Sequence, residues 1–378
     1  MIKNKPLLFF SILLSITFVI TSINVIQFFL ERASFQYSDW LINYQIGFIR
    51  RGFIGEIFYH LSKITNIGLD VLLLFFVLSL YLLFYINFFK IIKKIKFKII
   101  DYFIILSPLS FFYTVFEQKV SGRKEIIFFC LLSFFILIIK KISQRNQVNV
   151  MMLFTTITSL THSGLIFYNI YFLLLFFCYN YNNNFKQIIY LVLPFIISSI
   201  LVLLLISFNS TISEEELRLL CSSIIDYLPN CGKGDYIQTL SWGLKYNFEG
   251  NKLLWFDKSF FIFYFFAFIF TFCSFFYVSK KTTFFNFNFL YIIIICLLPT
   301  LPLYFIGADY GRYLHISYIS SIIIYYFLLS EKIIKRNILF LSFRKIIFIP
   351  LLFLYSFTWT VPHCCESEPK FNYRKIIE

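Results

Sequence analysis

The chain has 378 residues, of which 59% are hydrophobic and only 14% are charged, and its mean hydropathy is +0.79. Soluble domains carry about 25% charged residues, so this composition excludes an ordinary soluble globular protein. The net charge of +15 would suggest nucleic acid as the partner of a soluble chain. Here Lys and Arg fall mostly in short loops between apolar segments, where they set the orientation of membrane spans. We therefore expect a lipid bilayer and no nucleic acid.

The first apolar segment, at about residues 7–28, follows a short basic start. It resembles a signal peptide, but the apolar stretch continues to Leu30 and no small-residue cleavage site appears, which predicts an uncleaved first span. Placing the first five residues in the cytoplasm puts residues 31–70 on the outer side. Every strongly basic loop that follows then lies on the cytoplasmic side, as the positive-inside rule requires.

The later apolar segments are each long enough to cross a hydrocarbon core about 30 Å thick. They are expected at 71–89, 99–116, 125–139, 188–208, 259–278, 285–306, 313–330 and 346–361. The stretch 151–180 is too long for one straight span, and predicts two short spans or a helix broken near residues 161–164. The sequence thus predicts an all-α fold, a polytopic transmembrane helical bundle of about ten or eleven spans. We expect a single integral membrane domain over residues 1–378 whose longest extracytoplasmic loop is 209–258.

The eight cysteines divide between these two environments. Those expected inside spans are interpreted as small buried residues, and they are Cys130, Cys178, Cys273 and Cys296. Those expected on the outer side, where disulfides persist, are Cys221, Cys231, Cys364 and Cys365. We predict a disulfide between Cys221 and Cys231 within the long loop.

The first outer loop carries a basic motif, Gly47-Phe-Ile-Arg50-Arg51-Gly52-Phe-Ile-Gly55-Glu56. Adjacent arginines between glycines suit a phosphate group, because guanidinium offers a charged, forked set of donors and glycine lets the backbone approach. The alternative is that Arg50 and Arg51 bind lipid headgroups at the interface. Their departure from the positive-inside pattern favours a functional role.

Two further short outer turns carry charge. Arg123 and Lys124 open the span that begins at Glu125, where their charge adds to the helix dipole in favour of an anion; alternatively, they are solvated charges of an ordinary turn. In the turn between two later spans, Asp309 and Arg312 either pair with each other or act on a substrate, with Arg312 contacting an anion that Asp309 orients.

Three residues are candidate general bases. Asp39 and Glu56 lie in the first outer loop, and His162 lies near the break in the 151–180 stretch. Each could take a proton from an attacking hydroxyl, although a lone His is also a common structural hydrogen-bonding residue. The four histidines show no metal-ligand spacing and the chain has no P-loop, so we predict no metal, no cofactor and no nucleotide.

This layout of spans, with an acidic and arginine-bearing first outer loop and one long later loop, resembles the polytopic glycosyltransferases of the GT-C superfold. It is also similar to the O-antigen polymerases (Wzy-type) of bacterial surface polysaccharides. The resemblance implies a multi-pass protein of the bacterial inner (cytoplasmic) membrane whose active site faces the periplasm. It also implies polymerisation of undecaprenyl-diphosphate-linked oligosaccharide repeat units, with a chain-length regulator as a possible protein partner. The residues that would hold the diphosphate are Arg50, Arg51, Arg123 and Arg312.

Two other functions stay open. The first is a GT-C transferase that uses a polyprenyl-monophosphate sugar, in which Asp39 would matter most, often together with a divalent metal. The second is a flippase or transporter of lipid-linked oligosaccharides, which would need charged residues along the full depth of a central cavity. The charges gathered at one face favour an enzyme that works on that face.

Overall fold

The computed structural model describes residues 5–32, 35–256, 258–284, 287–337, 345–364 and 370–371. Nearly all regular structure in them is helical, which confirms the expected all-α class, although fewer helices than the expected ten or eleven spans are long and apolar enough to cross a membrane. Within these ranges, six helical segments are long and apolar enough to cross a membrane. They are α1 (Lys5–Glu31), α4 (Leu69–Ile92), α10 (Phe185–Phe208), α13 (Lys258–Lys280), the pair α14 (Phe289–Leu297) and α15 (Leu301–Ile306), and α16 (Tyr310–Ser330). The chain is therefore a multi-pass helical membrane protein.

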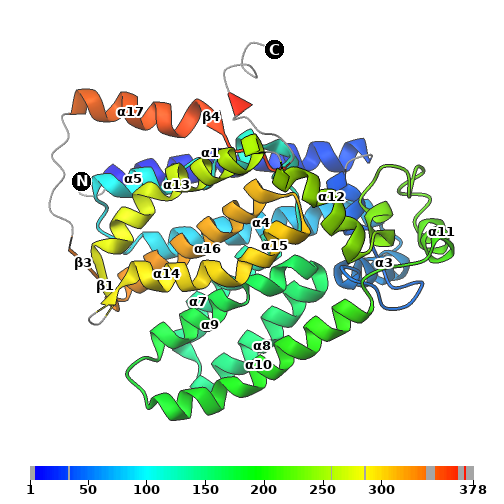
Figure 1. The fold of residues 1–378 in the computed structure, drawn as a ribbon, viewed down its shortest axis with the longest axis horizontal. Helices are drawn as coiled ribbons and strands as arrows, with labels where there is room; N and C mark the ends of the chain where they lie inside the picture. Colours follow the sequence, from blue (N-terminus) through cyan, green and yellow to red (C-terminus); the bar gives the residue numbers. More distant parts are fainter. Residues whose placement is uncertain are drawn as a thin grey trace. The chain divides into compact units, whose positions relative to one another are not determined.

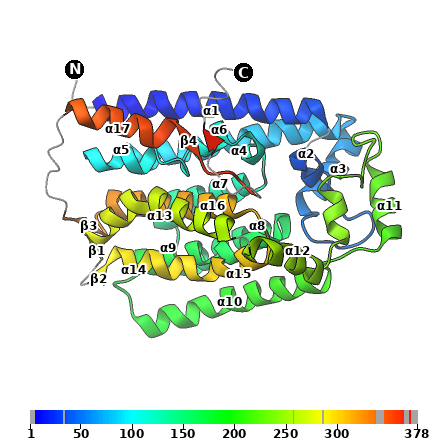
Figure 2. The ribbon, with the colours of Figure 1, turned by 45° about the horizontal axis from the view of Figure 1, so that its top comes forward.

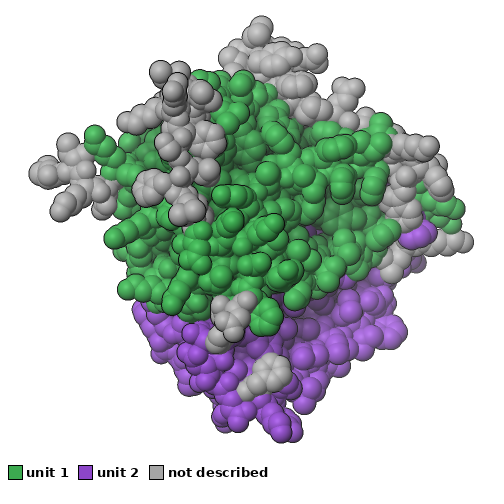
Figure 3. Space-filling model, turned by 60° about the vertical axis from the view of Figure 1, so that its left-hand side comes forward, with its two compact units in different colours: residues 1–21, 85–121, 249–378 green, residues 22–84, 122–248 purple. Residues whose placement is uncertain are grey.

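The chain divides into two compact units, each assembled from segments distant in the sequence (Figure 3). Unit 1 comprises Met1–Thr21, Tyr85–Ser121 and Glu249–Glu378, and unit 2 comprises Ser22–Phe84 and Gly122–Phe248.

In unit 2, α8 (Gln144–Thr161) and α10 lie side by side (Figures 1 and 2). The α8 helix begins at the N-cap Ser143, whose hydroxyl accepts a hydrogen bond from the Asn146 amide. It ends where His162 adopts an extended backbone, and the chain continues as a 3-10 turn (Ser163–Tyr168) and α9 (Ile170–Tyr179). The predicted break is confirmed, although α8 begins earlier than expected.

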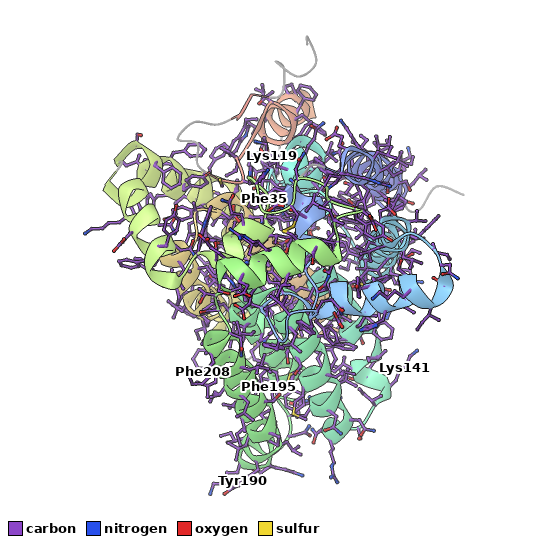
Figure 4. All side chains as sticks on the ribbon, turned by 90° about the vertical axis from the view of Figure 1, so that its right-hand side faces the viewer. Phe35, Lys119, Lys141, Tyr190, Phe195 and Phe208 are labelled. Carbon is purple, nitrogen blue, oxygen red and sulfur yellow. A yellow bond between two sulfur atoms is a disulfide. The ribbon has the colours of Figure 1, made fainter. Side chains whose placement is uncertain are left out.

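The outward face of α10 is apolar. Only 17% of its most hydrophobic stretch is buried within the protein, and Tyr190 and Phe208 project from it with 76% and 84% of their surfaces exposed (Figure 4). A helix that is apolar on every face, yet little covered by protein, needs lipid as its surroundings.

Two short helices of unit 2, α2 (Phe35–Trp40) and α3 (Phe53–Thr65), lie in the connection between α1 and α4. Unit 2 also contains α7 (Glu125–Ile138) and, in the long loop after α10, α11 (Glu214–Ser223). The predicted Cys221–Cys231 disulfide is present, with its Cα atoms 5.4 Å apart. The expected burial is confirmed for Cys130, Cys178 and Cys296 but is wrong for Cys273, which lies on an exposed apolar face of α13 in unit 1.

In unit 1, α16 forms the core, with 89% of its most hydrophobic stretch buried. It packs on α13 through aromatic pairs such as Phe272–Tyr318, whose ring centroids are 4.9 Å apart. Beside it, the strands β1 (Thr282–Phe284), β2 (Phe287–Asn288) and β3 (Lys335–Arg336) form an antiparallel sheet in the order β2-β1-β3. The helical segment expected from 285 therefore starts only at Phe289.

The expected continuous span over 99–116 is wrong. The helix α5 (Ile99–Ile105) ends early, the chain turns, and a short α6 (Tyr113–Phe116) follows. Pro108 lacks the amide that would donate to the Ile104 carbonyl in an intact helix, and this carbonyl accepts from the Tyr318 hydroxyl at 2.8 Å. The last elements of unit 1 are α17 (Lys345–Phe357) and the short paired strands β4 (Trp359–Thr360) and β5 (Lys370–Phe371). Of the C-terminal cysteines, Cys364 is disulfide-bonded and Cys365 lies outside the described residues.

Candidate functional site

The α2 helix brings the first acidic candidate against the start of α7. The Trp40 indole N–H donates to the Gly122 carbonyl at 2.6 Å, and the Gly122 amide donates to the Tyr81 hydroxyl at 3.1 Å. Gly122 has φ +74°, a left-handed conformation that glycine adopts without steric cost. This turn places Lys124 beside Asp39.

Asp39 is buried between two of the predicted basic residues. Its Oδ1 lies 3.3 Å from the Lys124 Nζ, and its Oδ2 lies 3.9 Å from an Nη of Arg51. The Lys124 ammonium also donates to the Arg51 carbonyl at 2.8 Å. The structure thus joins residues from two separate sequence motifs at one buried carboxylate.

Arg51 has an unusual environment for a buried cation. Its backbone is left-handed, with φ 72°, and only 9% of its surface is exposed. Its guanidinium lies over the ring of Tyr236, 4.6 Å from the centroid. Its Nε and Nη1 make no hydrogen bond among the described residues, and Nη1 is the nitrogen that lies 3.9 Å from Asp39, beyond hydrogen-bond distance. Buried polar groups are normally hydrogen-bonded, so these donors suit an anionic ligand.

Two further arginines complete the group, which we call the Asp39 cluster: Asp39, Arg50, Arg51, Arg123 and Lys124. The Arg50 Nη2 donates to the Thr239 carbonyl at 2.9 Å, while burial and the neighbouring Arg51 lower the pKa of Arg50. The Arg123 guanidinium lies 5.4 Å from the centroid of the Phe35 ring, labelled in Figure 4. That ring in turn contacts Tyr236, with centroids 4.7 Å apart.

The electrostatics of the cluster favour an added negative charge. Lys124 is fully buried, and this burial lowers the pKa of its ammonium to about 8, with Asp39 opposing the shift and Arg51 adding to it. Lys124 lies with Arg51 beside two buried carboxylates, Asp39 and Glu125, and Arg50 adds a third cation next to Arg51. A cationic excess in a buried place is costly unless an anion balances it.

The glycines of the first motif have a packing role. A Cβ at Gly55 would lie 1.9 Å from the Ile42 carbonyl oxygen, and one at Gly52 would lie 2.4 Å from the Tyr44 ring. The start of α3 therefore packs closely against the residues that follow α2. These contacts give Gly52 and Gly55 a packing role, and approach of a ligand to their backbone stays a prediction.

The other two candidate bases have local partners. Glu56 accepts from the Tyr44 amide at 2.7 Å, and its Oε1 lies 2.7 Å from the His60 Nε2. Burial raises the pKa of Glu56, but these hydrogen bonds lower it overall, which makes Glu56 a poor proton acceptor. His162 caps α8, with its amide donating to the Thr158 carbonyl at 2.9 Å, and its role as a base stays a prediction.

The third predicted turn belongs to unit 1. Arg312 donates to Asp309 at 2.5 Å, which confirms the alternative that these two residues pair across the turn. Next to them, the His363 Nδ1 lies 3.3 Å from the Glu117 Oε1, and both side chains are largely buried. Sequence reasoning missed this second pair. The one signal for it was that both residues were expected on the outer side.

The side chains Asp309, His363 and Cys364 have potential metal-ligand atoms within 4.8 Å of one another. The Cys364 sulfur is in a disulfide and so offers no thiolate, and Arg312 already neutralises Asp309. These residues do not fit a metal ion. The chain after β4 is held by the Tyr264 hydroxyl, which donates to the Pro362 carbonyl at 3.1 Å.

No protein-family model matches this chain, and no curated protein or solved structure is detectably similar to it. Fold and site together define a multi-pass helical membrane protein that holds a buried, cation-rich cluster around one carboxylate.

Proposed function

We propose that the chain is a membrane glycosyltransferase that polymerises undecaprenyl-diphosphate-linked oligosaccharide repeat units at the periplasmic face of the bacterial inner membrane. The observation that carries the proposal is the Asp39 cluster. It combines the carboxylate of Asp39 with a buried Arg51 whose Nε and Nη1 make no hydrogen bond among the described residues, Nη1 lying 3.9 Å from that carboxylate.

The charge balance supports a diphosphate. The printed contacts of Arg50, Arg51 and Lys124 bring three cations beside the buried carboxylates Asp39 and Glu125. A diphosphate that joins a lipid to a sugar keeps one ionised oxygen on each phosphorus, so it brings negative charge to this cation-rich place. Arginine is suited to such a group because its fork of N–H donors matches the spacing of phosphate oxygens.

In the proposed reaction, Asp39 accepts the proton of the acceptor sugar's hydroxyl. The hydroxyl oxygen forms a bond to the anomeric carbon of the donor, and the bond from that carbon to the diphosphate oxygen breaks. The electron pair leaves with the lipid diphosphate, whose growing charge Arg51, Arg123 and Lys124 stabilise. When the donor draws Lys124 and Arg51 to its oxygens, a carboxylate oxygen of Asp39 becomes free to accept the proton.

The proposal is tested by the length of surface polysaccharide on gels, in cells that lack this gene and are complemented with variants. Wild type should restore the ladder, and Arg51→Ala should leave a single repeat unit. Arg145→Ala is the matched control, because Arg145 is an exposed basic residue in the first turn of α8. Immunoblots of membranes establish equal amounts of protein. A full ladder with Arg51→Ala would refute the proposed role of the cluster.

A second candidate is the GT-C transferase with a polyprenyl-monophosphate donor. It is favoured by Asp39, an acidic residue in the loop after the first helix that sits among the basic residues. The divalent metal often found in that superfold does not fit here, since Lys124 and Arg51 face the two oxygens of Asp39. Purified protein offered both donors separates the two functions: the polymerase needs a diphosphate-linked oligosaccharide, and the transferase needs a monophosphate-linked monosaccharide.

A further inference from the structure

The long loop after α10 lies directly on the loop between α1 and α4. The Tyr236 amide donates to the Ser38 hydroxyl at 2.9 Å, next to Asp39 in the sequence. The side-chain amide of Asn43 donates to the Ser223 hydroxyl at 3.1 Å, and the Arg50 guanidinium donates to the Thr239 carbonyl. Each contact lies within unit 2. The stretch 223–242 therefore forms one wall of the Asp39 cluster, and we call it the covering segment.

Within the covering segment, Tyr236 is the residue that touches Arg51. The Tyr236 ring accepts the guanidinium on its face, 4.6 Å from the centroid, and is held at its side by the Phe35 ring. A cation–π contact stabilises the charge of an arginine through the flat face of the guanidinium. The N–H donors in the guanidinium plane are not consumed by such a contact. This accounts for a buried Arg51 whose Nε and Nη1 make no hydrogen bond among the described residues, with Nη1 lying 3.9 Å from Asp39.

The disulfide is connected to Tyr236 by a short chain of hydrogen bonds. Cys221 and Cys231 close a ring at the end of α11. Asp235 accepts from the Gly232 amide at 2.8 Å and from the Gln238 amide at 3.0 Å. Asp235 thereby ties the disulfide ring to the 3-10 turn Ile237–Ser241, which begins directly after Tyr236. A cross-link of this kind restricts the conformations open to the loop.

We propose that Tyr236 is a positioning residue that holds the Arg51 guanidinium for the donor's phosphate, and that the Cys221–Cys231 disulfide keeps Tyr236 in that place. The identity of the ligand rests on the proposed function. The arrangement also predicts that phosphate binding depends on an oxidised loop, which suits a protein whose covering segment lies outside the cytoplasm.

The test is the affinity of the purified full-length protein, in lipid nanodiscs, for undecaprenyl diphosphate, with undecaprenol as the probe that lacks phosphate. Tyr236→Leu keeps apolar bulk but removes the π face, and it should weaken undecaprenyl diphosphate binding roughly tenfold. Tyr236→Phe should bind as wild type does. Tyr246→Leu is the matched control, because Tyr246 lies in the same loop, is exposed and contacts another ring, that of Trp242, with centroids 5.1 Å apart. Binding of undecaprenol should be unchanged throughout.

A merely structural role for Tyr236 is separated by a double-mutant cycle with Arg51→Ala. If Tyr236 acts through Arg51, the double variant should bind undecaprenyl diphosphate no more weakly than Arg51→Ala alone. Additive losses would overturn the proposal. Replacing both Cys221 and Cys231 by Ser should weaken binding in the same direction as Tyr236→Leu, and unchanged binding would overturn the role of the disulfide. Wild-type protein that does not bind undecaprenyl diphosphate would instead overturn the proposed function.

Discussion

The Lys124 ammonium joins two groups of the loop between α1 and α4: it lies 3.3 Å from the Asp39 carboxylate and donates to the Arg51 carbonyl at 2.8 Å. Its side chain is fully buried at the start of α7. One cation thereby fixes both the candidate base and the left-handed backbone of the arginine beside it. Because of this link, we expect a substitution of Lys124 to disturb the cluster more than a substitution of any of its other residues.

The titration of Lys124 predicts an alkaline limit to activity. Burial lowers its pKa to about 8, so the ammonium is charged below that pH and loses its charge above it. We expect kcat/KM for the lipid-linked donor to fall above pH 8, approaching about tenfold per pH unit. Lys124→Arg should move this decline to higher pH, because guanidinium stays protonated. A decline that is unchanged in Lys124→Arg would assign it to another group.

The lowered pKa of Lys124, which predicts a loss of activity at alkaline pH, predicts a gain of stability there. The folded pKa of Lys124 lies below its ordinary value of 10.5, so the unfolded chain binds more protons between these two values. The free energy of unfolding should therefore rise as pH increases from about 8 to 10.5, where other groups permit. Thermal unfolding of the wild type and of Lys124→Met at both pH values checks the sign, since the variant should lack this contribution.

Replacing Asp39 should separate chemistry from binding. Asp39→Asn keeps the size of the side chain but removes the proton acceptor, and turnover at saturating donor should fall by about 10²–10⁴-fold. Affinity for undecaprenyl diphosphate should be retained or increased, because the cluster loses a negative charge. Glu56→Gln is the control, because Glu56 is held by Tyr44 and His60. Wild-type turnover in Asp39→Asn would exclude Asp39 as the base.

In unit 1, a buried ion pair joins α5 to β3. The Arg336 guanidinium donates to the Asp101 carboxylate at 2.7 Å, and the Tyr326 hydroxyl donates to the same oxygen at 3.2 Å. Arg336→Met leaves Asp101 charged and buried without its partner, which should cost about 3–5 kcal/mol of stability. Lys94→Met removes half of the more exposed Lys94–Glu331 pair and should cost at most about 1 kcal/mol. Equal losses in denaturation experiments would contradict this ranking.

The close approach at Gly55 predicts a contrast between two glycines. Gly55→Ala places a Cβ 1.9 Å from the Ile42 carbonyl oxygen, so α3 must shift away from α2 and activity should fall with stability. Gly250 lies within α12 (Leu244–Phe256), and its Cβ would meet nothing within 4 Å. Gly250→Ala should therefore raise stability by about 0.4–1 kcal/mol. Comparing the melting temperatures of the two variants in one detergent checks the prediction.

The sequence by itself determined the membrane class and much of the helix layout, including α1, α4, α10, α13 and α16. Hydropathy is summed along the chain. A run of about 20 apolar residues therefore indicates a membrane span, whatever other helices it packs against. The outer location expected for Cys221 and Cys231 was likewise enough to predict their disulfide. The basic motifs could be recognised because arginine between glycines, or at a helix start, is a local pattern.

Only the tertiary structure decided which of the basic and acidic residues contact one another. Lys124 and Arg51 are 73 positions apart in the sequence, and no periodicity in an almost wholly apolar helix tells which face turns toward which neighbour. The same holds for Tyr236 on Arg51 and for His363 beside Glu117. Ion pairs and cation–π contacts act over a few ångströms, so they follow from how the helices and loops pack, which the composition of each segment leaves undetermined.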